Sequence, residues 1–513
     1  MPTTPTTTPA ALLRARDLWP EATAIRDTQW GEPVELTWAD LTAEVETFAA
    51  ALVALGVEPG DRVAVWAPNS YHWPIAALGV HFAGAVLVPL NTRYTVSEAR
   101  DIVARSGALV VVAAGAFAGA DRLSEVLGSP IAENRTVIGI PLTDAVPPGA
   151  LPWDRFLATA TDEARAVVRR RVSALRPDDL SDILFTSGTT GAPKGVLAEH
   201  RQTVAGARAW GANGGLRPDD SYLMVNPFFH TFGYKAGILP CVLFGATMLP
   251  LAVYSPTQAM TTVATEHATV FPGAPTIFQT ILDHPDRTHY DLTSLRLVVT
   301  GATVVPVVLV ERLQSELGVH TVLTAYGQTE TSGFITTCTA DDDAETVART
   351  CGRPFDGMEV RLGENGEVLA RGAMVMRGYL DDPKATAETV DDDGWLHTGD
   401  VGTLDEHGNL TITDRLKDMY ICGGFNVYPA EVEQALTRLP GVTEAAVIGV
   451  PDERLGEVGA AFLTRRPDSD VTVDEVLTYA AEHLANFKVP RTVAFVDEFP
   501  RNASGKILKR ELG

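Results

Sequence analysis

Short runs of β-branched and apolar residues alternate with longer amphipathic segments from the N-terminus to about residue 340. The predicted strands of this part lie at 61–68, 108–114, 221–230, 247–251, 268–275, 295–302 and 320–327. Segments of helical periodicity, at 40–56, 256–267 and 306–318, separate or precede them. This alternation predicts parallel βαβ units, with ligands at the carboxyl ends of the strands.

The pattern changes after about residue 350, where short strands separated by turn residues predict a small β-rich region at 359–372 and 402–414. A further unit follows Asp414, with helices expected near 429–438 and 473–485 and strands at 444–450, 460–466 and 492–498. We therefore expect an α/β protein. Its large N-terminal domain, residues 1–416, consists of βαβ layers plus the β-rich region, and a smaller α+β domain covers 417–513.

Composition agrees with a folded enzyme-sized protein. The chain has 513 residues, 45% hydrophobic and 21% charged, which excludes a disordered or fibrous protein. Its 65 acidic and 41 basic residues give a net charge of −24. Such a chain repels nucleic acid and anionic membranes at long range, so we expect no nucleic-acid partner, and an anionic ligand needs a local positive site.

No targeting or metal-binding pattern is evident. Residues 2–9 are rich in Thr and Pro and are expected to fray, and no basic start with an apolar core follows. The longest apolar run, Ile75–Leu90, is interrupted by His81 and is too short for a bilayer. The four cysteines lack zinc-site or disulfide spacing. We expect a cytoplasmic protein without stable membrane insertion.

The segment Leu184–Val196, LFTSGTTGAPKGV, has the composition of a triphosphate-binding loop. Its glycines let backbone N–H groups turn toward an anion, its hydroxyls add donors and its lysine adds a charge. The residues concerned are Thr186, Ser187, Gly188, Thr189, Thr190, Gly191, Lys194 and Gly195. The spacing of a Walker A motif is absent, which disfavours a P-loop phosphotransferase. A flexible surface loop is the alternative interpretation.

This string resembles the phosphate loop of the adenylate-forming superfamily, which includes acyl-CoA synthetases, adenylation domains of peptide synthetases and beetle luciferases. Four further motifs follow in the order of that family and extend the resemblance over nearly the whole chain. They are Tyr326-Gly327-Gln328-Thr329-Glu330, Trp395-Leu396-His397-Thr398-Gly399-Asp400, Asp414-Arg415-Leu416-Lys417-Asp418 and Asn502-Ala503-Ser504-Gly505-Lys506.

The resemblance implies an AMP-forming acid–thiol ligase that uses ATP, Mg²⁺ and coenzyme A. A carboxylate, already ionised at neutral pH because its pKa is about 4, attacks the α-phosphate. Glu330 would bind Mg²⁺, Thr329 an α-phosphate oxygen, Tyr326 the adenine, and Asp400 the ribose. Arg415, Gly301, Ala302 and Gly327 complete the implied nucleotide site. Four of these residues have a structural alternative: core packing for Tyr326, a helix N-terminal acid for Glu330, a turn for Asp400 and a surface ion pair for Arg415.

The small domain carries the rest of the implied mechanism. Lys506 would bridge the attacking carboxylate and the α-phosphate in the first half-reaction. The domain would then rotate about Lys417, and the loop with Gly423 and Gly424 would line the pantetheine tunnel. Cys422, with no histidine nearby in sequence, is interpreted as a packing residue.

The resemblance places the acyl pocket at Phe229, His230, Thr303, Ala325 and Gly333. Amino-acid-activating relatives carry Asp after the corresponding phenylalanine. His230 stands there instead, which favours a plain organic acid, and it orients the carboxylate or gates the tunnel unless it is purely structural. The small residues Gly301, Ala302, Gly327 and Gly333 would allow a wide pocket. Lys235 is expected to be solvated, and the alternative is contact with a polar group of the substrate or a phosphate of CoA.

Within the superfamily, the chain resembles actinobacterial ligases for bulky acids derived from steroid or terpenoid skeletons. The partners implied are this acid, ATP and CoA, with a homodimer possible. Three alternatives remain open: a medium- or long-chain fatty acyl-CoA synthetase, a stand-alone enzyme that loads a carrier protein, and a non-catalytic adenylate-binding relative. The last would be expected to lose Lys506 or Glu330, and both are present.

Overall fold

A computed structural model describes residues 4–186, 193–301, 305–415, 418–422, 425–427, 429–452, 454–466, 468–501 and 507–512. The chain packs into two compact units. The first comprises residues 1–360 and 370–396, and the second comprises 361–369 and 397–513. Among the described residues, we find no helix with the length and apolarity needed to cross a bilayer.

The first unit contains a nine-stranded sheet with the order β18-β17-β16-β15-β14-β12-β13-β1-β2. Its outer strands are β1 (Thr23–Asp27) and β2 (Val34–Thr37) at one end and β17 (Thr336–Thr337) and β18 (Arg353–Pro354) at the other. Its central strands run parallel: β12 (Ser221–Met224), β13 (Thr247–Pro250), β14 (Val270–Pro272), β15 (Leu297–Gly301) and β16 (Thr321–Tyr326). The carboxyl ends of these strands therefore lie along one edge, where the segments after Met224, Gly301 and Tyr326 begin.

A second, eight-stranded sheet of the same unit has the order β21-β11-β10-β4-β3-β5-β8-β9, in which the last strand, β9, spans Leu151–Pro152. The strands β3 (Arg62–Trp66), β4 (Val86–Pro89), β5 (Val110–Ala114), β8 (Thr136–Ile140) and β10 (Leu180–Thr186) are parallel. Antiparallel strands β11 (Lys194–Glu199) and β21 (Gly378–Tyr379) complete one edge. These buried strands read as continuous apolar runs because helices cover parallel sheets on both faces.

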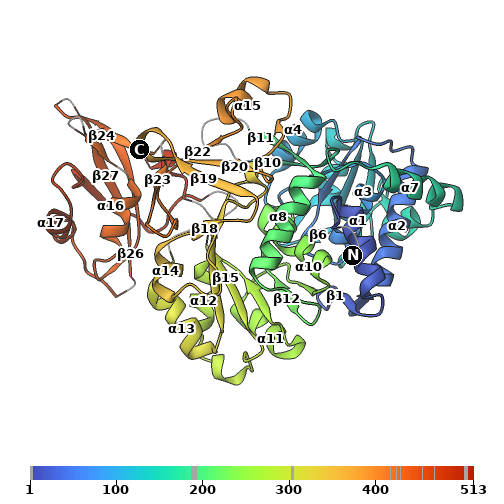
Figure 1. The fold of residues 1–513 in the computed structure, drawn as a ribbon, viewed down its shortest axis with the longest axis horizontal. Coiled ribbons are helices and arrows are strands. Elements are labelled where there is room, and N and C mark those ends of the chain that lie inside the picture. The colour runs from blue at the N-terminus through green and yellow to red at the C-terminus, as the bar shows by residue number, and fades with distance from the viewer. Residues whose placement is uncertain are drawn as a thin grey trace. The chain divides into compact units, whose positions relative to one another are not determined.

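The helices pack by their apolar stripes. In α2 (Trp38–Ala54), a capping box of Thr37 and Asp40 begins the helix, and Leu41, Val45 and Phe48 are fully buried. Beside strands β12 and β15, Figure 1 shows the helices α11 (Pro256–Glu266), α12 (Pro275–Leu282) and α13 (Val307–Leu317). The α/β fold expected from the alternation of strands and helices is confirmed.

The N-terminal segment is more ordered than its composition suggests. Helix α1 spans Thr8–Leu18, the side chain of Thr7 accepts the N–H of Ala10, and Pro9 occupies the first turn. Thr8 is fully buried, and its Oγ1 lies 2.8 Å from Nδ1 of His81. The prediction that residues 2–9 fray is therefore wrong for Thr7 to Pro9, because a buried histidine holds Thr8.

The second unit contains most of a four-stranded sheet whose strands lie in the order β19 (Met358–Leu362), β20 (Glu367–Gly372), β22 (Leu396–Leu404) and β23 (Leu410–Arg415). It also contains a five-stranded sheet in which β24 (Tyr420–Cys422), β27 and β26 lie side by side and β28 (Thr492–Phe495) pairs with β27. The long hairpin of β26 (Val442–Asp452) and β27 (Gly456–Arg465) is flanked by α16 (Pro429–Leu436) and α17 (Val473–His483). The α+β character expected for this region is confirmed. The boundary predicted at 416–417 lies outside the described residues and stays a prediction.

Several element boundaries differ from the sequence expectation. The strand expected at 221–230 ends at Met224, because a proline follows at position 227 and the chain turns there. The apolar run Ile75–Leu90 is divided between helix α3 (His72–Phe82) and strand β4. Periodicity alone does not separate a fully buried helix from the strand that follows it.

Candidate functional site

Strands β10 and β11 flank the glycine-rich loop. They pair antiparallel, with Thr186 opposite Lys194, and Oγ1 of Thr186 donates to the carbonyl of Lys194 at 3.4 Å. The loop therefore joins two strands, and helix α8 (His200–Asn213) begins only after β11. Between these anchors, Ser187, Gly188, Thr189, Thr190 and Gly191 lie outside the described residues.

The segment from Tyr326 to Glu330 leaves the carboxyl end of β16 and turns sharply. A 3₁₀ turn covers Thr329–Thr331, and the N–H of Gly333 donates to the carbonyl of Gln328 at 2.8 Å. Tyr326, Thr329 and Glu330 are half-buried. The turn brings these side chains to the same sheet edge as the loops after the neighbouring parallel strands.

The structure gives a reason for a glycine at position 327 that the sequence interpretation missed. A Cβ at this position would lie 2.2 Å from the carbonyl oxygen of Gly333. Likewise, a Cβ on Gly301 would lie 3.0 Å from the carbonyl oxygen of Ala325. The idea that these two glycines widen the acyl pocket is wrong, because neighbouring backbone occupies the space of the missing side chains.

The carboxylate of Glu330 is held by a tyrosine from the other sheet. The hydroxyl of Tyr379, on β21, donates to Oε1 of Glu330 at 2.8 Å. The ammonium of Lys194 lies 4.7 Å from the centre of the Tyr379 ring. Tyr379 therefore contacts both residues: its hydroxyl bonds Glu330, which the sequence assigned to Mg²⁺, and its ring faces Lys194, which the sequence assigned to phosphate.

The segment that carries Phe229 and His230 is fixed by Asn69, a buried residue just after strand β3. The amide of Asn69 donates to the carbonyls of Met224 at 3.0 Å and Asn226 at 2.9 Å, and its Oδ1 accepts the N–H of Phe228 at 2.9 Å. One side chain therefore sets the path of the backbone into the predicted acyl wall.

His230 is exposed and caps the short helix α9 (Thr231–Gly233). Its Nδ1 accepts the N–H of Phe232 at 3.2 Å. Since Nδ1 is an acceptor, the neutral ring carries its proton on Nε2, which leaves an N–H donor for a ligand.

Lys235 is buried, so the expectation that it is solvated is wrong. It lies on a π-helical turn, η2 (Tyr234–Ile238), and its Nζ lies 2.9 Å from Oδ1 of Asp182 on β10. Ser181 and Thr203 donate to the other carboxylate oxygen of Asp182. Such a charge remains in a protein interior only with a partner of opposite sign.

Two further residues of the predicted acyl pocket are described. Ala325 is half-buried next to the end of β16, and Gly333 has a φ of +97°, with Thr231 directly beside it. Through this contact, the turn after β16 packs against the segment that contains His230. Ala302 and Thr303 lie outside the described residues.

In the second unit, Asp400 is buried on β22 (Leu396–Leu404). Its backbone N–H donates to Oγ1 of Thr398 at 3.1 Å, and Thr398 donates to the carbonyl of Val368 at 2.7 Å. The carboxylate of Glu367 accepts the N–H of Gly399 at 3.1 Å. These contacts fix the backbone of Thr398, Gly399 and Asp400 within a strand, so the alternative interpretation of Asp400 as a turn residue is wrong.

The remaining predicted residues lie partly or wholly outside the described residues. The backbone of Arg415 pairs with Asp400 across β22 and β23, and nothing is described of the Arg415 side chain. Lys417, Gly423, Gly424 and Lys506 lie outside the described residues. Cys422 is buried, as expected of a packing residue.

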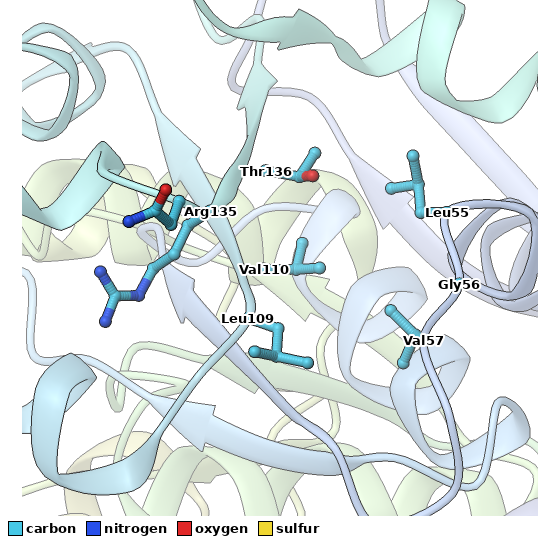
Figure 2. A pocket seen from close by; sticks show the side chains of 8 residues that line it. Leu55, Gly56, Val57, Leu109, Val110, Arg135 and Thr136 are labelled. Atoms are coloured by element: carbon cyan, nitrogen blue, oxygen red, sulfur yellow. The ribbon is translucent and has the colours of Figure 1, made fainter.

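A hollow of about 460 Å³ lies elsewhere on the first unit, where β5 and β8 begin (Figure 2). Its lining includes Leu109, Val110, Arg135 and Thr136. The guanidinium of Arg135 is occupied by backbone carbonyls, one of them at 2.8 Å. Because the strands are parallel, this hollow lies at the end opposite to Thr186, and it contains none of the predicted site residues.

Sequence reasoning missed three residues that organise the site: Asn69, Asp182 and Tyr379. Asn69 had a usable signal, since a polar residue directly after a buried parallel strand lies at the ligand-binding edge. Asp182 and Tyr379 had none, because each acts through a partner more than 40 positions away in the sequence.

Comparison with known proteins identifies the family. The sequence profile of AMP-binding enzymes matches residues 13–380, and that of the AMP-binding enzyme C-terminal domain matches residues 431–506. The chain is also similar over its full length to ATP-bound MatB from Rhodopseudomonas palustris. The TM-score is 0.82 at 28% identity, with 99% of this chain and 98% of that chain covered.

Two relatives are more similar in sequence. The 3-[(3aS,4S,7aS)-7a-methyl-1,5-dioxo-octahydro-1H-inden-4-yl]propanoyl:CoA ligase of Rhodococcus jostii is 57% identical over 99% of this chain and 98% of its own length. The ligase of the same name from Mycobacterium tuberculosis is 56% identical over 99% of both chains. With both profiles matched in order along one chain, the protein belongs to the family of AMP-binding enzymes, the adenylate-forming acid–thiol ligases.

Proposed function

We propose that this protein is an ATP-dependent acid–CoA ligase whose substrate is a bulky bicyclic propanoic acid of the kind named for its two relatives. The observation that carries this proposal is an identity of 57% and 56% to those ligases across essentially the whole chain. The matched regions cover 99% of this chain and therefore include the acyl-wall segments as well as the nucleotide motifs. Identity at this level supports the class of acid as well as the class of reaction.

The reaction has two steps. A carboxylate oxygen of the acid attacks the α-phosphorus of ATP and pyrophosphate leaves, which gives an acyl adenylate. The thiol of CoA then attacks the acyl carbon, and AMP leaves. No general base is needed in the first step because the acid is ionised, so the protein must supply positive charge and orientation.

The chain's own cations fit that demand. Lys194 stands at the end of the phosphate loop, next to Thr186, and is assigned to the phosphates. Lys506 is assigned to the oxygens shared by the attacking carboxylate and the α-phosphate. In a protein with a net charge of −24, these local charges oppose a field that would otherwise repel ATP.

Glu330 fits Mg²⁺ by the chemistry of its donor, since Mg²⁺ prefers carboxylate and phosphate oxygens and commonly takes one or two carboxylates. Glu330 and the nucleotide phosphates would hold the ion. When bound, Mg²⁺ neutralises phosphate charge and so reduces repulsion between the two anionic reactants. Thr329 next to Glu330 is assigned to an α-phosphate oxygen, and Tyr326, Asp400 and Arg415 to the nucleoside.

The acid is assigned to the surface formed by Phe229, His230, Ala325 and Gly333, together with Thr303. Nε2–H of His230 is a donor suited to a carboxylate or carbonyl oxygen of the acid. Lys417 is assigned as the hinge that withdraws Lys506 before CoA enters, with Gly423 and Gly424 beside the pantetheine arm. A cytoplasmic location and a homodimer stay predictions.

The test is an acid panel with and without CoA, read as pyrophosphate release, AMP and thioester. The panel contains an indane-dione propanoate of the type named for the relatives, medium- and long-chain fatty acids, and amino acids. We expect the bicyclic acid to give the highest kcat/KM, with AMP and thioester formed one to one.

Three results would overturn parts of this proposal. A higher kcat/KM for fatty acids would replace the substrate class. Acid-dependent pyrophosphate release without thioester from CoA, but with transfer to a phosphopantetheinylated carrier protein, would replace the acceptor. Formation of ADP in place of AMP would overturn the reaction itself.

A further inference from the structure

Tyr379 stands at the junction of the two large sheets of the first unit. It pairs with Val196 of β11, and its N–H donates to Oγ1 of Thr386 at 2.9 Å. Its side chain is only 8% exposed. The backbone of Tyr379 is therefore fixed from both sides, which limits where its hydroxyl can point.

The hydroxyl points at Glu330, on the turn after β16 of the other sheet. It donates to Oε1 at 2.8 Å, and the backbone carbonyl of Glu330 accepts the N–H of Met376 at 2.7 Å. Among the described residues, Tyr379 is the group that bonds this carboxylate, through one oxygen. A carboxylate held by one oxygen retains lone pairs on the other for a cation.

Chemistry fixes the direction of this hydrogen bond. A phenol hydroxyl has a hydrogen to donate, whereas an ionised carboxylate offers only acceptor oxygens. At 2.8 Å, the hydroxyl of Tyr379 therefore donates to Oε1 of Glu330, and the carboxylate accepts.

The ring of the same tyrosine meets the phosphate loop. The ammonium of Lys194 lies 4.7 Å from the ring centre, within the range of a cation–π contact. Lys194 is the first residue of β11, opposite Thr186 at the end of β10, and is half-buried. The aromatic face thus limits the positions open to a long, flexible side chain.

We propose that Tyr379 is a positioning residue that couples the metal ligand to the phosphate-binding lysine, orienting the Glu330 carboxylate through its hydroxyl and Lys194 through its ring. The inference rests on the proposed function, because it takes Glu330 and Lys194 as the groups that meet Mg²⁺ and the phosphates. Tyr379 itself touches neither the nucleotide nor the metal in this account.

Two consequences separate this role from general support of the fold. Partners that orient a metal ligand typically change metal affinity by 10- to 100-fold when they are removed. Loss of the hydroxyl alone should therefore weaken binding of the metal–nucleotide complex while binding of the metal-free nucleotide is unchanged. Loss of the ring should weaken both.

The experiment is calorimetric titration with α,β-methylene ATP, in excess Mg²⁺ and in EDTA. For Tyr379→Phe we expect the affinity for the Mg²⁺ complex to fall by about 10-fold or more and the affinity in EDTA to stay within twofold of wild type. For Tyr379→Leu we expect both affinities to fall. In EDTA, the double variant Lys194→Met/Tyr379→Leu should lose no more nucleotide affinity than Tyr379→Leu alone.

Tyr254→Phe is the matched control. This half-buried tyrosine also donates its hydroxyl to the protein, to the carbonyl of Ile277 at 2.8 Å, and among the described residues its hydroxyl partners are Ile277 and Thr280, neither of which belongs to the site. Both nucleotide affinities should be unchanged in this variant. Thermal unfolding of every variant measures any general loss of stability.

Two outcomes would overturn the inference: a Tyr379→Phe variant with wild-type affinity for the Mg²⁺ complex, or one in which both affinities fall equally. Either would leave the proposed function intact if wild-type enzyme forms AMP and thioester from acid, ATP and CoA. Wild-type enzyme that binds the nucleotide without any effect of Mg²⁺ and forms no AMP would overturn the proposed function instead.

Discussion

Asp182 and Lys235 form an ion pair in the interior of the first unit. Oδ1 and Nζ lie 2.9 Å apart, and the two side chains are 0% and 1% exposed. Asp182 lies on β10, which leads into the phosphate loop, and Lys235 follows His230 by five positions. The pair therefore ties the strand before the nucleotide loop to the segment assigned to the acid.

Replacement of Lys235 by methionine should strongly destabilise the first unit. The methionine keeps the apolar stem but leaves the Asp182 charge buried without its partner, which costs about 3–5 kcal/mol. Urea denaturation measures the change in the free energy of unfolding. The double variant Lys235→Met/Asp182→Asn should recover part of the loss.

The control for that variant is Lys384→Met, since the ammonium of Lys384 is 3.8 Å from Glu388 and both side chains are exposed. Exposed pairs contribute little, so the expected change is below about 1 kcal/mol. Equal losses in Lys235→Met and Lys384→Met would contradict the assignment of a buried ion pair.

Two substitutions at His230 distinguish the role of Nδ1 as a helix cap from the role of Nε2–H as a donor to the acid. Asparagine also caps helices, so His230→Asn should retain stability, whereas His230→Ala should lose about 1 kcal/mol. Both lose the Nε2–H donor, and loss of one hydrogen bond should raise KM for the acid about fivefold. Steady-state kinetics with varied acid, and with varied ATP as the internal control, would show whether the effect is confined to the acid.

His81 should make stability depend on pH. Burial lowers the pKa of His81 to about 4, against about 6.5 in the unfolded chain. Between these values only the unfolded state holds the proton, so stability falls by about 1.4 kcal/mol per pH unit as pH falls from 6.5 to 4, and the effect is absent above 6.5.

The measurement is the difference in this slope between wild type and His81→Gln, from urea denaturation between pH 4.5 and 7.5. Carboxylates that titrate in the same range contribute equally to both proteins and cancel. We expect a slope smaller in the variant by about one proton. Identical slopes would mean that His81 does not resist protonation in the folded state.

Gly327→Ala should impair nucleotide turnover, because the new Cβ would overlap the carbonyl of Gly333 and push the Thr329–Glu330 turn from its place. A displacement of about 1 Å in a catalytic group can lower rates about 100-fold. Gly115→Ala is the control, since a Cβ there meets nothing closer than 3.9 Å. Wild-type kcat/KM for ATP in Gly327→Ala would show that the turn is not required.

Lys506→Ala should lower the rate of acyl-adenylate formation by about 10²–10³ while thioester formation from supplied acyl adenylate is largely retained. Single-turnover assays of the two half-reactions measure this. Lys509→Ala is a control in the same terminal segment, where the ammonium lies 2.8 Å from Glu433. Equal loss of both half-reactions in Lys506→Ala would remove its assigned role.

The α/β architecture was predictable because strand and helix periodicities act locally. The runs at 61–68 and 295–302 became β3 and β15, and the segment at 306–318 became α13. The edge of the nine-stranded sheet that carries Gly301 and Tyr326 was predictable too, since parallel strands place their carboxyl ends together. These features need no information about distant partners.

What the sequence did not reveal depends on contacts between distant segments. The residues near Lys235 do not indicate its partner Asp182, and those near Thr8 do not indicate His81. Lys235 and Thr8 were therefore expected in solvent. The role of Gly327 was misread because the space that its side chain would need is occupied by the backbone of Gly333. Tyr379 gave no signal because its partner Glu330 lies on a different sheet.

In the proposed reaction, a carboxylate oxygen of the acid attacks the α-phosphorus of ATP. A bicyclic propanoic acid labelled with ¹⁸O in its carboxyl group tests this directly, with the mass of the nucleotide product measured after turnover with ATP and CoA. The account predicts AMP that carries one ¹⁸O, because the carboxyl oxygen stays on phosphorus when the thiol displaces AMP. Unlabelled nucleotide, with the label in orthophosphate and ADP as the product, would contradict it.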